Sequence, residues 1–529
     1  MGQYCQPVHG FIRSNKMTNS AQLPVQMTPQ QARHLLVRTG FAPTQAEVEK
    51  LVGKSAQRAV SDIITAAVAA KPKYPAPAFA SQPPPTPANQ LKTVDERQEQ
   101  RRAQIAEGVE LKAWWLREML ETPNPLAERM VLFWHNHFAT SQQKVVRSLA
   151  MWRQHELFRS QALGNFGILL HAVARDPAML VYLDAANSRR EAPNENFARE
   201  VMELFTLGEA TQGGGYTEQD IKEVARAFTG WSVERDDFTF KYRGGAHDVF
   251  TKKVLGKTGL MDGDDVLDIM LAQPACGEFI VGKLWKEFVS PTPDAAEVKR
   301  IAKRFKESNF AINVALTELL STDTFWADSN RGSLIKSPVD LVVGTVRQFA
   351  FSYSDVMPFV LKTSQLGQNL LMPPNVKGWP GYTDWINATT LLERKNFTQQ
   401  LFRTVELRSN GQTMELPKVM PMEMSKEMRG ELRNEMAQGG NSKVNLRTLQ
   451  LLGRQGVMRV AQSMATLTFD PDQFLGTYGG YTDREPTSAL KTTLAGVLLA
   501  SDATQKIANG TVGIAYLRAL TLDPAYQLK

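Results

Sequence analysis

The stretch YTEQDIKEVARAFTGW, Tyr216 to Trp231, decides the fold class. Thr217 followed three residues later by Asp220 forms a capping box, the pattern that marks the first turn of a helix. Apolar side chains then return at the spacing of one helical face, at Ile221, Val224, Ala225, Phe228 and Trp231. This period of 3.6 residues predicts a helix that starts at a cap and buries one stripe of its surface.

The same start signal recurs in both directions along the chain. It is present in Thr28-Pro29-Gln30-Gln31, in Thr44 with Glu47, and in Ser337-Pro338-Val339-Asp340. Two of these also have Pro at the first helical position, where its missing N–H costs nothing. We therefore predict a mainly α protein, a large multi-helix domain with a small β-hairpin insertion, in which helix exceeds half of the residues.

The hairpin is predicted from DFTFKYRGGAHDVFTKKVL, Asp237 to Leu255. Aromatic side chains alternate before a Gly-Gly pair, and β-branched residues follow it. The members of the alternation are Phe238, Phe240 and Tyr242, then Val249, Thr251 and Val254. The pattern predicts two strands that pair across Gly244-Gly245.

Proline density and polarity divide the chain into segments. KPKYPAPAFASQPPPTPANQ is too rich in Pro for helix and is expected to be extended and mobile. The predicted division is a disordered tail over 1–27, a helical segment over 28–70, a Pro/Ala-rich linker over 71–90, a main helical domain over 91–407 with the hairpin near 237–255, a polar Met-rich insertion over 408–443, and a C-terminal helical segment over 444–529 that packs on the main domain.

Composition excludes several classes of protein. Of 529 residues, 43% are apolar and 22% charged, which is typical of a globular chain. The net charge of +7 is not gathered into a basic stripe, so no nucleic-acid partner is expected. No apolar run reaches the ~18 residues of a membrane span, and polar Met1 to Gln31 carries no signal-peptide core, which predicts a cytoplasmic chain. Cys5 and Cys276 cannot form a disulfide framework, and Cys276 is expected to be a buried thiol.

The first candidate site is the run Trp134-His135-Asn136-His137-Phe138, at the end of a helical pattern that starts at Pro125. Residues two apart on a helix point about 200° away from each other, so His135 and His137 cannot readily share one metal. Glu128 precedes His135 by seven residues and could orient it. Either both histidines are hydrogen-bonded in a helical interior, or one of them is a ligand or general base.

The second candidate is NENFAREVME, Asn194 to Glu203, a helix with Asn194 as its predicted cap. Glu200 and Glu203 are three apart and lie on adjacent parts of one face. Paired carboxylates of this kind can hold a divalent metal or divide acid and base roles. The alternative is a salt-bridged face in which Arg199 and the glutamates pair with neighbours such as Arg226. Glu195, in the first turn, could join the site or favour the helix dipole.

Polar residues elsewhere are candidate binding residues. Asp176 precedes Pro177 and is expected to cap a helix, while Asp184 precedes the loop that leads to the glutamate helix. His247-Asp248 lies at the predicted hairpin turn, where it could complete a site on another element or serve only the turn.

An aromatic loop is a further binding candidate. PPNVKGWPG, Pro373 to Gly381, is followed by Trp385. If Trp379 and Trp385 are exposed, they could stack on a sugar or another flat ligand. If they are buried, they pin the loop to the helical body.

Long motifs resemble a bacterial family known as domain of unknown function 1800. They are WWLREML (Trp114 to Leu120), ERMVLFWHNHFATS (Glu128 to Ser141), QALGNFGILLHAVARDPAMLVYLD (Gln161 to Asp184), PNENFAREVMELFTLGE (Pro193 to Glu209), YTEQDIKEVARAFTGW, DGDDVLDIML, FWADSNRGSLIKSPVDLVVGTVRQ and PPNVKGWPGYTDWI. The resemblance implies a mostly helical fold. It also implies a partner resembling the alkaline-phosphatase superfamily, encoded nearby, and relatives that are often exported, which leaves the compartment open. It supplies no activity.

Two functional hypotheses follow. The first is a metal-assisted or acid/base hydrolase with its site between helices, in which His135, His137, Glu195, Glu200 and Glu203 are catalytic; its cofactor is left open, and a divalent metal could serve. The second is a non-catalytic scaffold or partner-binding protein in which the same residues form a buried polar network. The chain contains no GxSxG elbow, phosphate-binding loop, HExxH helix or dinucleotide fingerprint.

Overall fold

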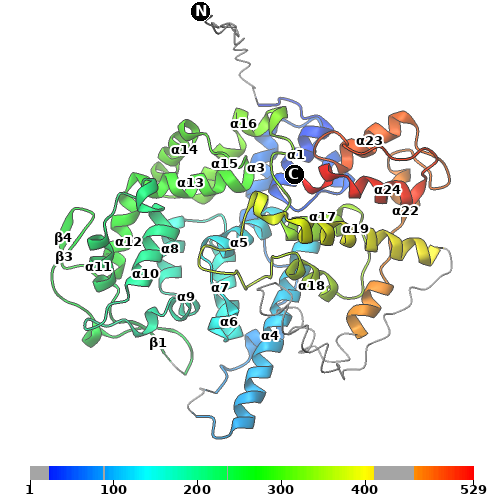
Figure 1. Ribbon diagram of the computed structural model, residues 1–529. Coiled ribbons are helices and arrows are strands. Elements are labelled where there is room, and N and C mark those ends of the chain that lie inside the picture. Colours follow the sequence, from blue (N-terminus) through cyan, green and yellow to red (C-terminus); the bar gives the residue numbers. More distant parts are fainter. Residues whose placement is uncertain (1–22, 87–89, 235, 410–457) are drawn as a thin grey trace, which may run out of the picture.

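The structure is a computed structural model that describes residues 23–86, 90–234, 236–409 and 458–529 (Figure 1). Helix makes up 61% of it, and strands occur only as two small antiparallel pairs in the described part, which confirms the predicted fold class. Most of the predicted tail over 1–27, most of the predicted insertion over 408–443, and residues 444–457 of the predicted C-terminal segment lie outside the described residues, as does Cys5.

The helices follow one another along the whole described chain. In the first half they are α1 (Pro29–Thr39), α2 (Gln45–Glu49), α3 (Ala56–Val68), α4 (Val94–Glu121), α5 (Pro125–His137), α6 (Gln142–Val145), α7 (Ser148–Ser160), α8 (Phe166–Ala174), α9 (Pro177–Tyr182), α10 (Glu195–Glu200), the π-helix η3 (Val201–Leu207) and α11 (Glu218–Ala227). In the second half they are α12 (Gly263–Ala272), α13 (Pro274–Phe288), α14 (Ala295–Glu307), α15 (Ile312–Leu320), α16 (Asp323–Trp326), α17 (Pro338–Gln348), α18 (Met357–Gln365), α19 (Ala388–Ser409), α22 (Pro471–Gly476), α23 (Ser488–Leu498) and α24 (Gly513–Leu522). Short 3-10 turns connect them: η1 (Ala78–Ser81), η2 (Ala185–Asn187), η4 (Ala210–Gln212), η5 (Gly244–Ala246), η6 (Asp328–Asn330), η7 (Tyr382–Trp385) and η8 (Pro524–Gln527).

The predicted helix starts are confirmed by their hydrogen bonds. Thr28, Thr44, Thr217 and Ser337 each accept from the backbone three residues on, and the N3 side chain bonds back to the cap in all four. These reciprocal bonds satisfy N–H groups that a helix leaves without an internal partner. The local signal was sufficient because both partners of a capping box lie within one turn.

Helix α5 is the centre of the fold. It packs against α1, α3, α4 and α7, and its side chains from Leu126 to His135 are buried without a break. In Figure 1 it lies between the half that contains α8–α15 and the half that contains α17–α24. The chain end returns to this centre, because α24 packs on α19 and Lys529 exchanges two backbone hydrogen bonds with Leu334.

The strands pair differently from the sequence-based expectation. β2 (Phe240–Tyr242) pairs with the earlier β1 (Trp231–Val233), and β3 (Lys252–Val254) pairs with β4 (Lys257–Gly259). The Gly-Gly pair folds into the 3-10 turn η5 instead of a hairpin turn. The second hairpin closes at Leu255 and Gly256, whose φ angles of 48° and 82° suit a two-residue turn between twisted strands.

The Pro/Ala-rich segment runs along α4. The backbone N–H groups of Lys73 and Tyr74 donate to the buried Glu118 carboxylate at 3.0 and 2.6 Å. Trp114 donates from its indole to the Pro75 carbonyl at 2.7 Å, and Phe79 is buried. The first half of the segment is therefore held against the helix, and its predicted mobility stays a prediction.

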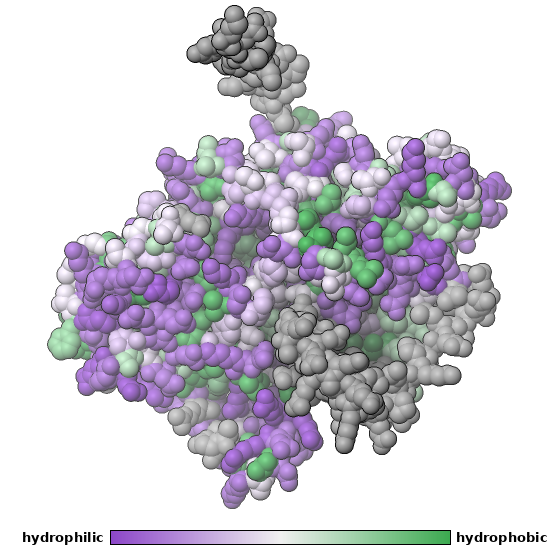
Figure 2. All heavy atoms as spheres, viewed as in Figure 1, coloured by the Kyte–Doolittle hydropathy of each residue, from purple (hydrophilic) through white to green (hydrophobic). Residues whose placement is uncertain are grey.

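None of the helices among the described residues is both long and apolar enough to cross a bilayer. On the face shown in Figure 2, hydrophilic residues dominate the half that contains α10–α14, and larger hydrophobic patches lie in the half that contains α17 and α24.

Candidate functional site

A cavity of about 420 Å³ opens where α5, α13, the loop that follows α18, and the last residue meet. We name it the His137 cavity. Its polar lining comes from Arg129, Asn136, His137, Lys283, Lys286, Glu287, Ser337, Asp340, Gln368, Lys377, Tyr382 and Lys529. Five of these side chains are cationic at neutral pH and two are carboxylates, so the lining carries an excess of positive charge.

His137 and Lys283 lie together on one wall. The Lys283 ammonium donates to Nδ1 of His137 at 3.1 Å and to the Leu204 carbonyl at 3.4 Å. His137 contacts the Phe205 carbonyl through Nε2 at 3.2 Å. A carbonyl can only accept, so Nε2 carries the imidazole proton and Nδ1 is free to accept from the lysine.

The two carbonyls belong to the end of the π-helix η3. Its wide turn is marked by Thr206, whose hydroxyl donates to the Val201 carbonyl five residues earlier at 2.7 Å. Gly208, with φ of 80°, then ends the helix. The last carbonyls of a helix have no partner within it. His137 and Lys283 donate to two of these carbonyls and so cap the end of η3 from outside. Their N–H groups therefore meet the negative end of the helix dipole.

Burial lowers the pKa of both His137 and Lys283 and so favours their neutral forms. Burial and the nearby Lys283 charge hold the pKa of His137 well below its usual range. Burial, with the charge of Lys286, lowers the pKa of Lys283 to about 8. No Asp or Glu among the described residues lies within ion-pair distance of Lys283, which distinguishes it from the paired cations of this protein.

A second group of lining residues forms ion pairs in which the charges are balanced. Arg129 pairs with Asp340 at 2.7 Å and with Glu287 at 3.2 Å. Lys529 pairs with Asp340 at 2.7 Å. Burial opposes ionisation of Asp340, but the two cations outweigh it and lower its pKa below the usual range. The cations of the lining that have no carboxylate partner among the described residues are Lys283 and Lys286, whereas Lys377 pairs with Glu209 at 3.4 Å.

The loop after α18 is fixed to α5 by Asn136. Its carboxamide oxygen accepts from the Trp379 backbone N–H at 2.6 Å. Gly378 has φ of 89°, and a Cβ there would lie 2.3 Å from the same oxygen, so only glycine allows this approach. Trp379 and Trp385 are 4% and 6% exposed, and Trp385 lines the cavity. Both tryptophans are therefore buried, which is the case in which we expected them to hold the loop against the helical body.

His135 lies on the other side of α5 in a closed network. Its Nε2 is 3.2 Å from Nδ1 of His155, and Arg159 donates to Nε2 of His155 at 3.2 Å. Arg159 also binds both carboxylate oxygens of Glu128, one of them at 2.9 Å, and the Trp115 indole donates to that carboxylate. Glu128 thus orients His135 through two intermediates. Burial, with the charge of Arg159, lowers the pKa of His135 to about 3.

The family model described as "Protein of unknown function (DUF1800)" matches residues 34–527. The chain belongs to the DUF1800 family. The resemblance seen in the motifs is thereby confirmed. No curated protein and no solved structure matches this DUF1800 chain.

The glutamates of this DUF1800 chain do not line the cavity, although the charge of its Lys377 reaches Glu200. Glu195 is exposed, and Glu200 and Glu203 are partly exposed. Burial and the charge of Glu203 raise the pKa of Glu200. Arg199 binds Glu218 in a bidentate pair at 2.9 and 2.7 Å. The structure does not bring these carboxylates into the lining shared by His137, and the described residues contain no group of three or more His, Cys, Asp and Glu placed to hold a metal.

The two aspartates before the glutamate helix have separate partners. Asp176 caps α9, as the sequence indicates, and also accepts from Gln154 at 2.8 Å. It is buried, no described Lys, Arg or His lies within ion-pair distance of it, and burial outweighs the charge of Arg153 and raises its pKa to about 7. Asp184 is exposed and pairs with Lys144 at 2.6 Å. They therefore do not form one cluster with each other.

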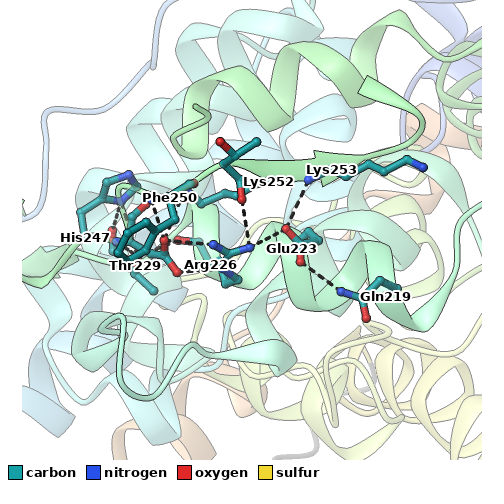
Figure 3. Close-up of polar contacts among 10 residues, drawn as sticks. Gln219, Glu223, Arg226, Thr229, His247, Phe250, Lys252 and Lys253 are labelled. Atoms are coloured by element: carbon teal, nitrogen blue, oxygen red, sulfur yellow. Dashed lines mark hydrogen bonds and ion pairs between the residues drawn. The ribbon is translucent and has the colours of Figure 1, made fainter. Parts of the chain in front are cut away.

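His247 and Asp248 belong to a network that ties the strands to α11, and Figure 3 labels its members His247, Thr229, Arg226 and Glu223. Asp248 accepts two bonds from Arg226 at 2.7 and 3.1 Å, and Arg226 also binds Glu223. His247 contacts the Thr229 carbonyl through Nδ1 at 2.9 Å. Arg226 is thus engaged here, and not with the Glu200 face that the sequence offered as its neighbour.

Sequence reasoning missed Asn136 and Lys283. Asn136 stands inside the quoted motif, but its role depends on a loop that lies 243 positions further along the chain. Lys283 is 146 positions from His137 and belongs to FIVGKLWKEF, which matches no catalytic pattern. The only local signal is a lysine between Ile280 and Leu284, both fully buried on α13.

Cys276 is buried and free. Burial raises the pKa of its thiol to about 12, so the thiolate is strongly disfavoured at neutral pH. This fits the structural role expected from the sequence.

Proposed function

We propose that the His137 cavity is the functional site and that it binds a small anion carrying a phosphate, sulfate or carboxylate group. The observation that carries the proposal is Lys283, a largely enclosed cation with no carboxylate partner among the described residues. A buried charge without a counter-ion is costly. A bound anion would supply that counter-ion.

The donors of Lys283 support this assignment. An ammonium group has three N–H bonds, and two of them point to His137 and to the Leu204 carbonyl. The third is left for the cavity that Lys283 lines. Lys286 follows one helical turn later and faces the same cavity, so an anion there would meet two cations from one helix.

The contacts favour binding over the hydrolase hypothesis in its original form. That hypothesis placed acid/base work on Glu195, Glu200 and Glu203, none of which lines the cavity. His137 stays as a polar group of the site, with Nδ1 held by Lys283 and Nε2 held by the Phe205 carbonyl.

The direct test is calorimetric titration of the full chain with sulfate and with inorganic phosphate. We expect saturable binding, weakened at least about tenfold by Lys283→Met, since a charge-assisted hydrogen bond contributes ~1.5–3 kcal/mol. Lys299→Met is the matched control, because Lys299 is an exposed lysine on the neighbouring α14. Equal affinities for wild type and Lys283→Met, or no saturable binding, would overturn the proposal.

The scaffold hypothesis is supported by the network around His135, where each buried charge has a partner. We propose that this side of α5 is structural. From the family resemblance alone, we also propose a protein of the alkaline-phosphatase-like superfamily as partner. Co-expression and co-purification of the two chains from cytoplasmic and exported fractions tests the partner and the compartment together. If each protein is recovered without the other, the proposed partnership is overturned.

A further inference from the structure

We propose that Lys283 is an amine nucleophile, and that the cavity accepts an anion that also carries an aldehyde or ketone, such as a 2-oxo acid, and binds it as an imine. This inference rests on the proposed anion site and names the chemical class of its ligand. The geometry around one nitrogen carries it.

Two fixed acceptors hold the Lys283 nitrogen. His137 Nδ1 is 3.1 Å away on α5, and the Leu204 carbonyl is 3.4 Å away at the end of η3. The neutral amine has two N–H bonds and one lone pair. When the two N–H bonds keep these acceptors, the lone pair occupies the remaining tetrahedral direction, which is the one towards the cavity. The amine is therefore oriented for attack before a ligand enters.

The surroundings also favour the neutral amine over the ammonium. No described carboxylate pairs with the nitrogen, and burial disfavours its charge, although the face of the Phe279 ring, with its centroid 4.9 Å away, attracts the charged form and opposes part of this effect. The other charged groups that line the cavity are Lys286 on α13, Lys377 on the loop, and the balanced ion group, which contains Arg129, Glu287, Asp340 and Lys529. Desolvation and a neighbouring cation are the two means by which proteins activate lysine nucleophiles, and both act here to lower the pKa of Lys283 to about 8.

The step is balanced without any other reactant. The ammonium first loses a proton to solvent, and the nitrogen lone pair then attacks the carbonyl carbon. The C–N bond forms as the carbonyl π pair moves to oxygen, and a proton passes from nitrogen to that oxygen. Protonation of the resulting hydroxyl and loss of water give the protonated imine. The carboxylate of the ligand takes the place of the anion beside Lys286.

The experiment traps the imine in the full chain. The protein is incubated with glyoxylate and cyanoborohydride, which reduces an imine to a stable secondary amine, and the modified lysines are located by peptide mass mapping. We expect Lys283 to react roughly tenfold faster than exposed Lys299 at pH 7.5, because a lower pKa leaves more of the neutral amine. The rate should be half-maximal near pH 8. Sulfate should protect Lys283 and leave Lys299 unaffected.

Lys283→Arg separates this inference from the anion site. Arginine keeps the charge but does not form the imine, so this variant should bind sulfate and lose the adduct, with a wild-type circular dichroism spectrum. Sulfate binding with no preferential adduct at Lys283 would overturn the inference and leave the anion site standing. A selective Lys283 adduct without saturable sulfate binding would support the nucleophile and overturn the anion site.

Discussion

His135 and His137 stand two positions apart on α5 and have opposite surroundings. Both are buried, both have a lowered pKa, and both use ring nitrogens in hydrogen bonds. The chain of contacts from His135 ends in an ion pair, Arg159 with Glu128. The chain from His137 ends at Lys283, on the wall of a cavity and without a carboxylate. One short motif thus serves two regions.

The difference shows which property separates a structural site from a binding site in this molecule. Burial and polarity are common to both sides of α5, so neither distinguishes them. The balance of charges distinguishes the two sides. On the His135 side Arg159 pairs with Glu128, whereas on the His137 side Lys283 faces a cavity without a described carboxylate partner. Removal of a charge should therefore be severe on the first side and mild for stability on the second.

The largest expected effect comes from breaking the ion pair on the His135 side. Arg159→Met leaves the Glu128 carboxylate buried and without its cation, which costs about 3–5 kcal/mol. Urea denaturation would measure the loss in the free energy of unfolding. Arg153→Met on the same helix is the control, because Arg153 is exposed and binds only loop carbonyls. Equal stability of the two variants would remove the distinction between the two sides.

A second effect comes from Asp176, a buried carboxyl with no described cation within ion-pair distance. Its pKa rises from 3.8 to about 7 on folding, so the folded state holds the proton more tightly than the unfolded state between these values. Stability contributed by this group is present at low pH and is lost as pH rises towards 7. Asp176→Asn keeps a good helix cap and should remove this slope, which gives a gain of about 1–3 kcal/mol at pH 8 and little change at pH 4.

Denaturation curves at several pH values test this, with Asp294→Asn as the matched control. Asp294 caps α14 through the same kind of bonds but is exposed. The Asp294 variant should follow the wild-type pH profile. If the pH profile of Asp176→Asn also matches that of wild type, burial of the Asp176 carboxyl without a partner does not change the pH dependence of stability. Charge balance would then explain less of the stability of this protein than we infer.

The sequence predicted what is local and missed what depends on distant residues. The caps at Thr28, Thr44, Thr217 and Ser337 and the helical stripes need only residues within a few turns. The strand partners were wrong because the choice between β1–β2 and a pairing across Gly244-Gly245 depends on which turn closes better. The position of His135 and His137 on different faces followed from helix geometry alone.

The cavity could not be predicted from the sequence, because it too depends on residues that are distant in the chain. It brings together His137, Lys283, Lys377 and Lys529, which come from separate parts of the chain and carry no common spacing. The acidic face of the glutamate helix was visible in the sequence. What opposes it was not, and the prediction that it shares a cavity with a histidine has no support in the lining of that cavity.

A smaller effect is expected when the charge of Lys283 is removed by pH instead of mutation. Sulfate affinity should fall about tenfold between pH 7 and pH 9, because the ammonium titrates near pH 8 while sulfate keeps its charge. Calorimetry at the two pH values measures the change. Lys283→Arg stays charged throughout and should give a flat profile. A wild-type profile as flat as that of the arginine variant would show that sulfate does not depend on the charge of Lys283.

The smallest effect is expected at the glutamates that the sequence made most prominent. The double variant Glu200→Gln, Glu203→Gln removes two partly exposed carboxylates of like charge, neither of which lines the His137 cavity, although the charge of Lys377 at its edge reaches Glu200. Such surface charges contribute only about 0–1 kcal/mol, and loss of their mutual repulsion offsets part of that. Stability, sulfate affinity and the Lys283 adduct should all stay at wild-type values, whereas Arg159→Met lowers stability, and Lys283→Met weakens sulfate binding and removes the adduct. If the double variant instead lost anion binding or a bound metal while it kept its helical spectrum, the acidic face would be part of the site. The contrast between the two sides of α5 would then be incomplete, because a third region would supply the missing carboxylates.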